Sequence, residues 1–159
     1  MRKLLSFAAL PIVALLLQTM TAGAAPQCSS PQNSFCAPGA WGKGNCYNSS
    51  VSFCAQGAVC SRPQNSFCAP GAWGAGGCYN NSVTFCTQGA LCSQPQNSFC
   101  QPGTGGKGGC YNNSVSFCAQ GAVCSQPQNS FCQAGPKGKG GCYNNSASVC
   151  DQGLLRSRR

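Results

Sequence analysis

The chain has 159 residues, including 16 cysteines, 21 glycines and 10 prolines, and its ten Lys and Arg residues outnumber a single acidic residue. It contains no histidine, and Asp151 is the one carboxylate side chain. General acid–base catalysis needs titratable groups with tuned pKa values, and sugar hydrolysis commonly needs two carboxylates. The composition therefore predicts a protein that is not an enzyme.

The N-terminal residues predict a signal peptide over residues 1–24. Arg2 and Lys3 precede an apolar stretch from Leu4 to Leu17, and Ala22-Gly23-Ala24 supplies the small residues of a cleavage site. A membrane span needs about 20 apolar residues, so this stretch is short for an anchor. We expect a secreted, extracellular protein, with cell-wall association allowed, that is oxidised and has no integral membrane association.

The cysteines recur with a period of 32 residues. Each copy has the spacing C-x7-C-x9-C-x7-C, and five residues separate one copy from the next. The pattern predicts four tandem four-cysteine modules, residues 28–54, 60–86, 92–118 and 124–150, followed by a basic tail at 151–159. An even number per module lets each module close its own two disulfides, although three connectivities stay open. The cysteines are Cys28, Cys36, Cys46, Cys54, Cys60, Cys68, Cys78, Cys86, Cys92, Cys100, Cys110, Cys118, Cys124, Cys132, Cys142 and Cys150.

Each module is itself a doubled unit whose halves allow two local structures. Glycine follows the second cysteine of every half by three residues, which suggests positive φ at Gly39, Gly57, Gly71, Gly89, Gly103, Gly121, Gly135 and Gly153. Ser30-Pro31 suits a helix N-cap and first helical position, with Asn80 and Asn81 as caps in a second half. The alternation Ser-Val-Ser-Phe-Cys suits a short β-strand instead.

A module of this size is too small for a sufficient hydrophobic core, so disulfides are expected to take the place of a core. We therefore predict a small disulfide-rich repeat array, mostly loop with short helical turns, and short β-hairpins are the alternative. The short links between modules, such as Ala55–Val59, predict modules packed closely as a rod or a chain of beads.

Two further sets of residues recur in phase with the cysteines. The first is an N-x-S sequence in every module, which makes candidate glycosylation sites of Asn48, Asn80, Asn112 and Asn144. Asn and Ser also suit turns, so the same residues fit a purely structural role. The second set is aromatic and gives candidate stacking residues for sugar rings, namely Trp41, Trp73, Tyr47, Tyr79, Tyr111 and Tyr143. The alternative role for each tyrosine is to cover a disulfide.

Metal and nucleic-acid binding are not expected. Zinc sites usually place two ligands within C-x2-4-C, whereas the closest cysteines here are six positions apart. We predict no metal site and no cofactor. Removal of Arg2 and Lys3 with the leader would leave eight of the ten basic residues against Asp151. Such sparse positive charge favours anionic walls, polysaccharides or membrane surfaces over nucleic acid.

The leader, the tandem C-x7-C units and the Gly-Asn loops resemble the small secreted cysteine-rich repeat proteins of plant-colonising filamentous fungi, including those induced on host surfaces or cellophane. The resemblance covers residues 28–150, rests on spacing, and carries no functional residues. It implies a candidate effector, linked to virulence, that acts outside the host cell or at its wall.

The expected function is non-enzymatic, multivalent weak binding to a cell-wall polysaccharide or a host surface component. A structural wall or matrix spacer is the alternative, and a cationic antimicrobial or toxin-like protein is a third possibility. The sequence leaves the ligand and the oligomeric state open.

Overall fold

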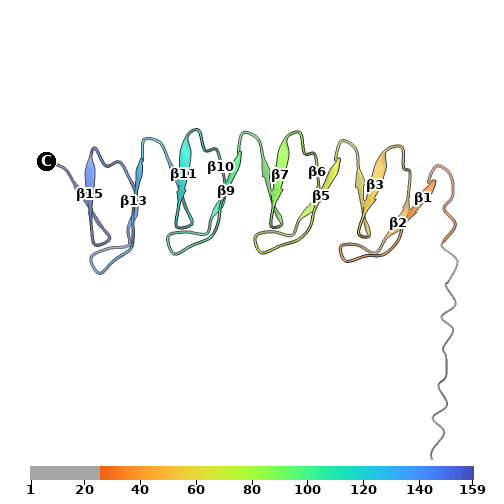
Figure 1. Cartoon of the computed structure of the whole chain (residues 1–159), viewed down its shortest axis with the longest axis horizontal. Coiled ribbons are helices and arrows are strands. Elements are labelled where there is room, and N and C mark those ends of the chain that lie inside the picture. Colours follow the sequence, from red (N-terminus) through yellow and green to blue (C-terminus); the bar gives the residue numbers. More distant parts are fainter. Residues whose placement is uncertain (1–25) are drawn as a thin grey trace, which may run out of the picture.

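A computed structural model describes residues 26–159, so the predicted signal peptide lies outside the described residues. The described chain forms sixteen short strands, paired as eight antiparallel hairpins that stand in a row (Figure 1). Two kinds of hairpin alternate. The long-loop hairpins are β1 (Ser34–Cys36) with β2 (Asn45–Tyr47), β5 (Ser66–Cys68) with β6 (Gly77–Tyr79), β9 (Ser98–Cys100) with β10 (Gly109–Tyr111), and β13 (Ser130–Cys132) with β14 (Gly141–Tyr143). The tight hairpins are β3 (Ser52–Ala55) with β4 (Ala58–Ser61), β7 (Thr84–Thr87) with β8 (Ala90–Ser93), β11 (Ser116–Ala119) with β12 (Ala122–Ser125), and β15 (Ser148–Asp151) with β16 (Leu154–Ser157).

The predicted short helical turns are wrong, and the alternative of short β-hairpins is confirmed. No helix occurs between residues 26 and 159. Ser30-Pro31 lies in a turn that the Gln32 N–H closes by donating to the Ser29 carbonyl (2.9 Å). Asn80 accepts the N–H two residues ahead on its Oδ1, as a cap would, but the turn ends at once and β7 follows.

Successive side chains of a strand point to opposite faces, and this alternation places neighbouring cysteines on opposite faces of a hairpin. In the first tight hairpin, Cys60 is the cross-strand partner of Phe53, the residue before Cys54. Cross-strand partners share a face and successive residues alternate, so Cys54 and Cys60 face opposite ways. Cys54 is bonded to Cys36 in the preceding hairpin, and Cys60 to Cys78 in the following one.

All sixteen cysteines are in disulfides, and one connectivity holds throughout: first to third and second to fourth in each module. The pairs are Cys28–Cys46, Cys36–Cys54, Cys60–Cys78, Cys68–Cys86, Cys92–Cys110, Cys100–Cys118, Cys124–Cys142 and Cys132–Cys150. The two cysteines of each pair are 18 residues apart in sequence. Closing a loop of this length lowers the conformational entropy of the unfolded chain, which stabilises the folded state by about 3 kcal/mol. Within the described chain, every disulfide after the first joins one hairpin to the next.

The boundaries between the cysteine modules lie inside the tight hairpins. β3 contains the last cysteine of module 28–54, and β4 contains the first cysteine of module 60–86. The link between them is a two-residue turn in which Gln56 has φ 46° and Gly57 has φ 89°. Positive φ at both central residues matches the type I′ turn, whose twist suits paired strands. The modules therefore form one continuous ladder of hairpins and not separate beads.

The row of hairpins has two edges, named here by the segments that form them. The tip edge holds the hairpin loops, residues 37–44 and 56–57 with their repeats. The connection edge holds the segments between hairpins, residues 48–51 and 62–65 with their repeats. On the tip edge the loops bond to each other through the backbone, since the Trp41 N–H donates to the Gln56 carbonyl (3.0 Å).

The expectation of positive φ is confirmed at Gly57, Gly89, Gly121 and Gly153, and it is wrong at Gly39, Gly71, Gly103 and Gly135. At the second set glycine is required because another segment of the backbone lies very close. A Cβ on Gly39, for example, would overlap the backbone of Gln56.

The fully buried side chains of the described chain are all cysteines. Sulfur and tightly packed backbone therefore form the interior that apolar side chains form in larger domains.

Candidate functional site

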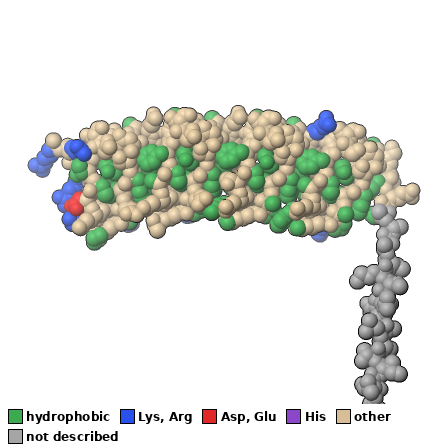
Figure 2. Space-filling view, in the orientation of Figure 1, with side chains coloured by type: hydrophobic (Ala, Val, Ile, Leu, Met, Phe, Trp, Pro, Cys, Tyr) green, Lys and Arg blue, Asp and Glu red, His purple; other side chains and the backbone are tan. Residues whose placement is uncertain are grey.

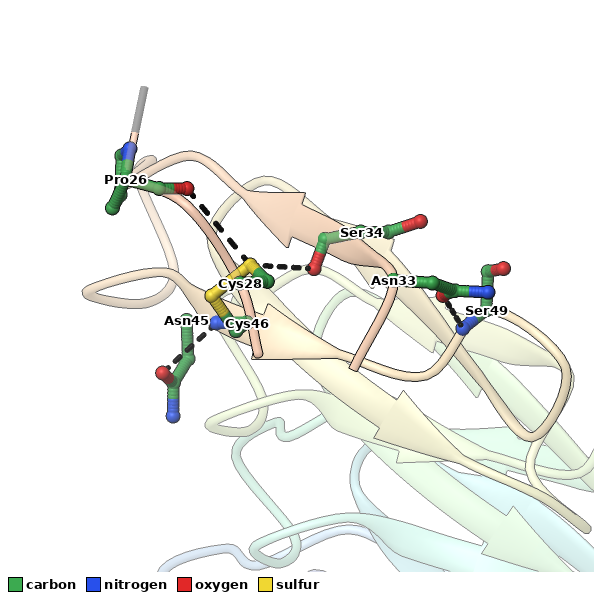
Figure 3. The surroundings of a disulfide bond; sticks show 7 residues. All are labelled: Pro26, Cys28, Asn33, Ser34, Asn45, Cys46 and Ser49. Atoms are coloured by element: carbon green, nitrogen blue, oxygen red, sulfur yellow. Dashed lines mark hydrogen bonds between the residues drawn. A yellow bond between two sulfur atoms is a disulfide. The ribbon is translucent and has the colours of Figure 1, made fainter. Parts of the chain in front are cut away.

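Asparagine side chains hold the segments of the connection edge together. Asn33 Oδ1 accepts a hydrogen bond from the Ser49 N–H at 2.8 Å (Figure 3). In the next module Asn65 makes two such bonds with Asn81, through Oδ1 to the backbone N–H and through Nδ2 to the side-chain oxygen, both at 2.8 Å. The same paired bonds recur at Asn97–Asn113 and Asn129–Asn145. This repetition gives the edge one local geometry in successive modules.

Three equivalent grooves lie on the connection edge in residues 26–159, one at each junction between a tight hairpin and the next long-loop hairpin. They have volumes of about 720, 270 and 390 Å³. The first is lined by Ser49, Ser52, Phe53, Arg62, Pro63, Gln64 and Asn65. The second is lined by Asn81, Ser82, Val83, Thr84, Phe85, Cys92, Gln94, Gln96 and Asn97, and the third by Asn113, Ser114, Val115, Ser116, Phe117, Gln126, Gln128 and Asn129.

The lining of these junction grooves combines an aromatic ring with amides and hydroxyls. Phe53, Phe85 and Phe117 are each partly buried, so part of each ring is open to solvent. In the second groove the Gln96 Nε2 donates to the Cys110 carbonyl at 3.4 Å, and no partner of its Oε1 is found within residues 26–159. Arg62 is the one charged side chain among the lining residues of the three grooves.

The groove phenylalanines were not among the residues singled out from the sequence. Their signal was present, because a phenylalanine precedes the fourth cysteine in three of the four modules and Val149 stands there in the last. In β3, Phe53 shares a face with Cys60, the face that looks toward the next hairpin. The place of Phe53 beside the next hairpin could be assigned only once the strands and the disulfide pairing were known.

The tryptophans predicted as stacking residues lie on the tip edge, away from the grooves. Trp73 packs on Phe99 of the next long-loop hairpin, with ring centroids 5.9 Å apart and planes inclined by 36°. Trp41 is 40% exposed. At the corresponding position of the third module, Gly105 lies against the ring of Phe131. The position therefore serves contact between successive modules in the second and third copies.

The four predicted tyrosines occupy one repeated position, the last residue of β2, β6, β10 and β14. All four are partly buried. In the third module, Tyr111 is on the same hairpin face as Cys100, and it lines a shallow cavity together with Cys118, the disulfide partner of Cys100. The tyrosines thus lie beside the second disulfide of each module, where they resemble covering residues more than groove residues.

The C-terminal end of the row carries an ion cluster. Lys137 Nζ lies 2.9 Å from Asp151 Oδ2, and Arg156 Nη2 lies 3.7 Å from the same oxygen. The hydrogen bond from Lys137 holds the pKa of Asp151 below its ordinary value, and the charge of Arg156 adds to this. Figure 2 shows Lys and Arg gathered at this end, whereas hydrophobic side chains recur along the face in view. Positive charge is therefore concentrated at one end and does not form a stripe.

Residues 26–159 contain no group of three or more His, Cys, Asp or Glu side chains placed to hold a metal ion. In the same part of the chain, no helix has the length and hydropathy needed to cross a membrane. No protein-family model, curated protein or solved structure matches the chain.

Proposed function

We propose that the protein is a secreted, non-enzymatic, effector-like rod that binds an extended neutral polysaccharide of a cell wall or host surface through its junction grooves. The observation that carries this proposal is the repetition of one groove, with equivalent lining residues, at three successive junctions. A ligand with its own repeat along a chain is the kind of partner that a repeated site suits.

The lining chemistry supports a neutral sugar polymer. A partly exposed phenylalanine ring offers an apolar surface for the C–H face of a sugar, and Gln, Asn, Ser and Thr offer donors and acceptors for its hydroxyls. Binding sites generally combine such an apolar surface with a few placed polar groups. With Arg62 as the one charged lining residue, the grooves offer little to attract a highly charged polymer.

Rigidity and repetition together make weak contacts useful. Each groove is shallow, so a single one is expected to bind a short oligosaccharide weakly. Linked sites raise the effective concentration for the second contact, and avidity then exceeds the affinity of one site by about 10²–10⁴ where geometry permits. The disulfides between successive hairpins hold the grooves in place, which lowers the ordering entropy lost on binding.

The second candidate, a structural spacer of wall or matrix, is favoured by the ladder itself. A rod whose buried side chains are all disulfide-bonded cysteines has few segments that can open locally to a protease. A spacer and a binding rod differ in one respect: a spacer has no need of the groove residues. Binding measurements on groove variants therefore separate the two candidates.

Replacing Phe53, Phe85 and Phe117 together with valine is expected to weaken binding to insoluble chitin, cellulose or isolated cell wall by at least about tenfold. Valine is chosen because Val149 occupies the same position in the last module. The measurement is a depletion isotherm with fully oxidised protein made in a host that does not glycosylate.

The matched control is Gln133→Ala, which changes an exposed residue outside the grooves and should leave the isotherm unchanged. Both proteins must show eight disulfides by intact mass before they are compared. If neither the parent protein nor the control binds any of the polymers saturably, the binding function is excluded in favour of the spacer. If the triple variant binds like the parent, the grooves are not the site.

A further inference from the structure

The N-x-S sequences form a regular set of polar groups on the connection edge, and their acceptor asparagines are not among the lining residues of the junction grooves. All four lie on the connection edge, in the segments that follow β2, β6, β10 and β14. In each, the Oδ1 of the asparagine accepts a hydrogen bond from the backbone N–H of the serine two residues ahead, at 2.9 to 3.0 Å. The acceptor asparagines are Asn48, Asn80, Asn112 and Asn144, and the serines are Ser50, Ser82, Ser114 and Ser146.

This geometry uses the oxygen of each amide and leaves its nitrogen free. Within residues 26–159, the Nδ2 atoms of the four acceptor asparagines have no hydrogen-bond partner. The contrast lies close by, because Asn65 donates its Nδ2 to the side chain of Asn81. On this edge Asn65 is therefore hydrogen-bonded through its side-chain nitrogen, whereas Asn80 is bonded through its side-chain oxygen alone.

The serine hydroxyl of each sequence is not engaged by the rest of the described chain. Ser50, Ser82, Ser114 and Ser146 are exposed, and in the described chain their hydroxyls make no hydrogen bond, whereas Ser52 Oγ pairs with Ser61 Oγ at 3.1 Å. Transfer of an oligosaccharide to asparagine requires the hydroxyl residue two positions on, in an accessible loop. Each segment therefore combines an exposed serine with a partly buried acceptor asparagine whose Nδ2 is not engaged, four times along one edge.

We propose that Asn48, Asn80, Asn112 and Asn144 carry N-linked oligosaccharides, so that the connection edge is a row of four glycans and the tip edge is bare. In the transfer step, Nδ2 bonds to the anomeric carbon of an oligosaccharide carried on a polyprenyl diphosphate. The carbon–oxygen bond to the diphosphate breaks, the diphosphate lipid leaves, and Nδ2 gives one proton to a base of the transferring enzyme. The glycans stand beside the junction grooves, because Ser49, Asn81 and Asn113 line them.

The test is secretion of the full chain from a eukaryotic host that glycosylates asparagine, followed by intact mass and peptide mapping before and after peptide-N-glycosidase treatment. The expected result is excess mass that the enzyme removes, with conversion to aspartate at the four acceptor positions. Secreted, fully oxidised protein whose four acceptor asparagines are unmodified would overturn the proposal.

A neighbouring pair of variants gives the matched control. Ser50→Ala removes the required hydroxyl and should lose the glycan at Asn48, while the backbone N–H that bonds to Asn48 stays in place. Ser49→Ala changes the middle residue and should keep the glycan. Equal occupancy in the two variants would contradict the assignment. If a variant is not secreted, translation with microsomes gives the same readout as a shift in mobility, independent of polysaccharide binding.

Discussion

Gly57→Ala is expected to prevent the first tight hairpin from forming its native turn, and to lower the stability of this region by about 2 kcal/mol or more. Gly57 has φ 89°, a conformation that L-residues rarely adopt, and it is buried. A Cβ at this position would also overlap the carbonyl of Gly42 in the facing loop. Because Cys54 and Cys60 flank the turn, their pairing with Cys36 and Cys78 should become incomplete.

The measurement is the fraction of protein with native disulfides after oxidative refolding, together with amide exchange in residues 39–60. Gly39→Ala separates the two causes, because Gly39 has no positive φ but meets the backbone of Gln56 at close range. Ala75→Lys is the control for a harmless change, since Ala75 is exposed on the tip edge and Lys43 is the equivalent residue of the first module. Refolding of Gly57→Ala as complete as that of Ala75→Lys would show that the tip edge is not packed as described.

Deletion of residues 60–91 is expected to give a shorter rod that folds and binds more weakly. The deletion removes one full period, so β3 is followed by a strand equivalent to β4 and every remaining cysteine keeps its partner. One junction groove is lost with it. If binding depends on several grooves engaging one polymer chain, affinity should fall by about tenfold, well beyond the loss in number of sites.

The control for this deletion is removal of residues 60–87, which takes out the same four cysteines but breaks the period. The tip of the first tight hairpin is then duplicated, and the spacing from Cys54 to Cys92 no longer matches that from Cys54 to Cys60. We expect the 60–91 deletion to give one oxidised species by reversed-phase chromatography, and the 60–87 deletion to give several. Similar homogeneity in both would mean that the period does not set the pairing of the hairpins.

The module boundaries could be predicted from the sequence because they depend only on the spacing of the cysteines. Four cysteine modules follow from the 32-residue period, and no disulfide in the described chain crosses from one module to another. Connectivity was not predictable, because the spacing C-x7-C-x9-C-x7-C suits all three pairings. The observed pairing is selected by the opposite facing of Cys36 and Cys46 in the long-loop hairpin together with that of Cys54 and Cys60 in the tight hairpin. This facing is a property of paired strands.

The helical prediction failed because proline before a short segment and glycine after it occur at the ends of helices and in the turns of hairpins alike. The decisive local signal was Gln56-Gly57 between Ala55 and Ala58, a two-residue turn between pairing strands. Gly39 was assigned a φ requirement when its requirement is space, which depends on a loop distant in the sequence. The junction grooves are likewise formed across a module boundary, so a search within single modules could not assemble them.

The most direct measurement of the ladder is disulfide mapping of the first module under non-reducing conditions. Chymotryptic cleavage after Phe35, Trp41, Tyr47 and Phe53 places its four cysteines on separate peptides. The structure predicts two linked species. In one, the peptides of Cys28 and Cys46 are joined to each other alone. In the other, the peptide of residues 54–67 joins the Cys36 peptide through Cys54 and the Cys78 peptide through Cys60. Recovery of Cys28 bonded to Cys36, or of Cys28 bonded to Cys54, would contradict the ladder and, with it, the placement of the junction grooves.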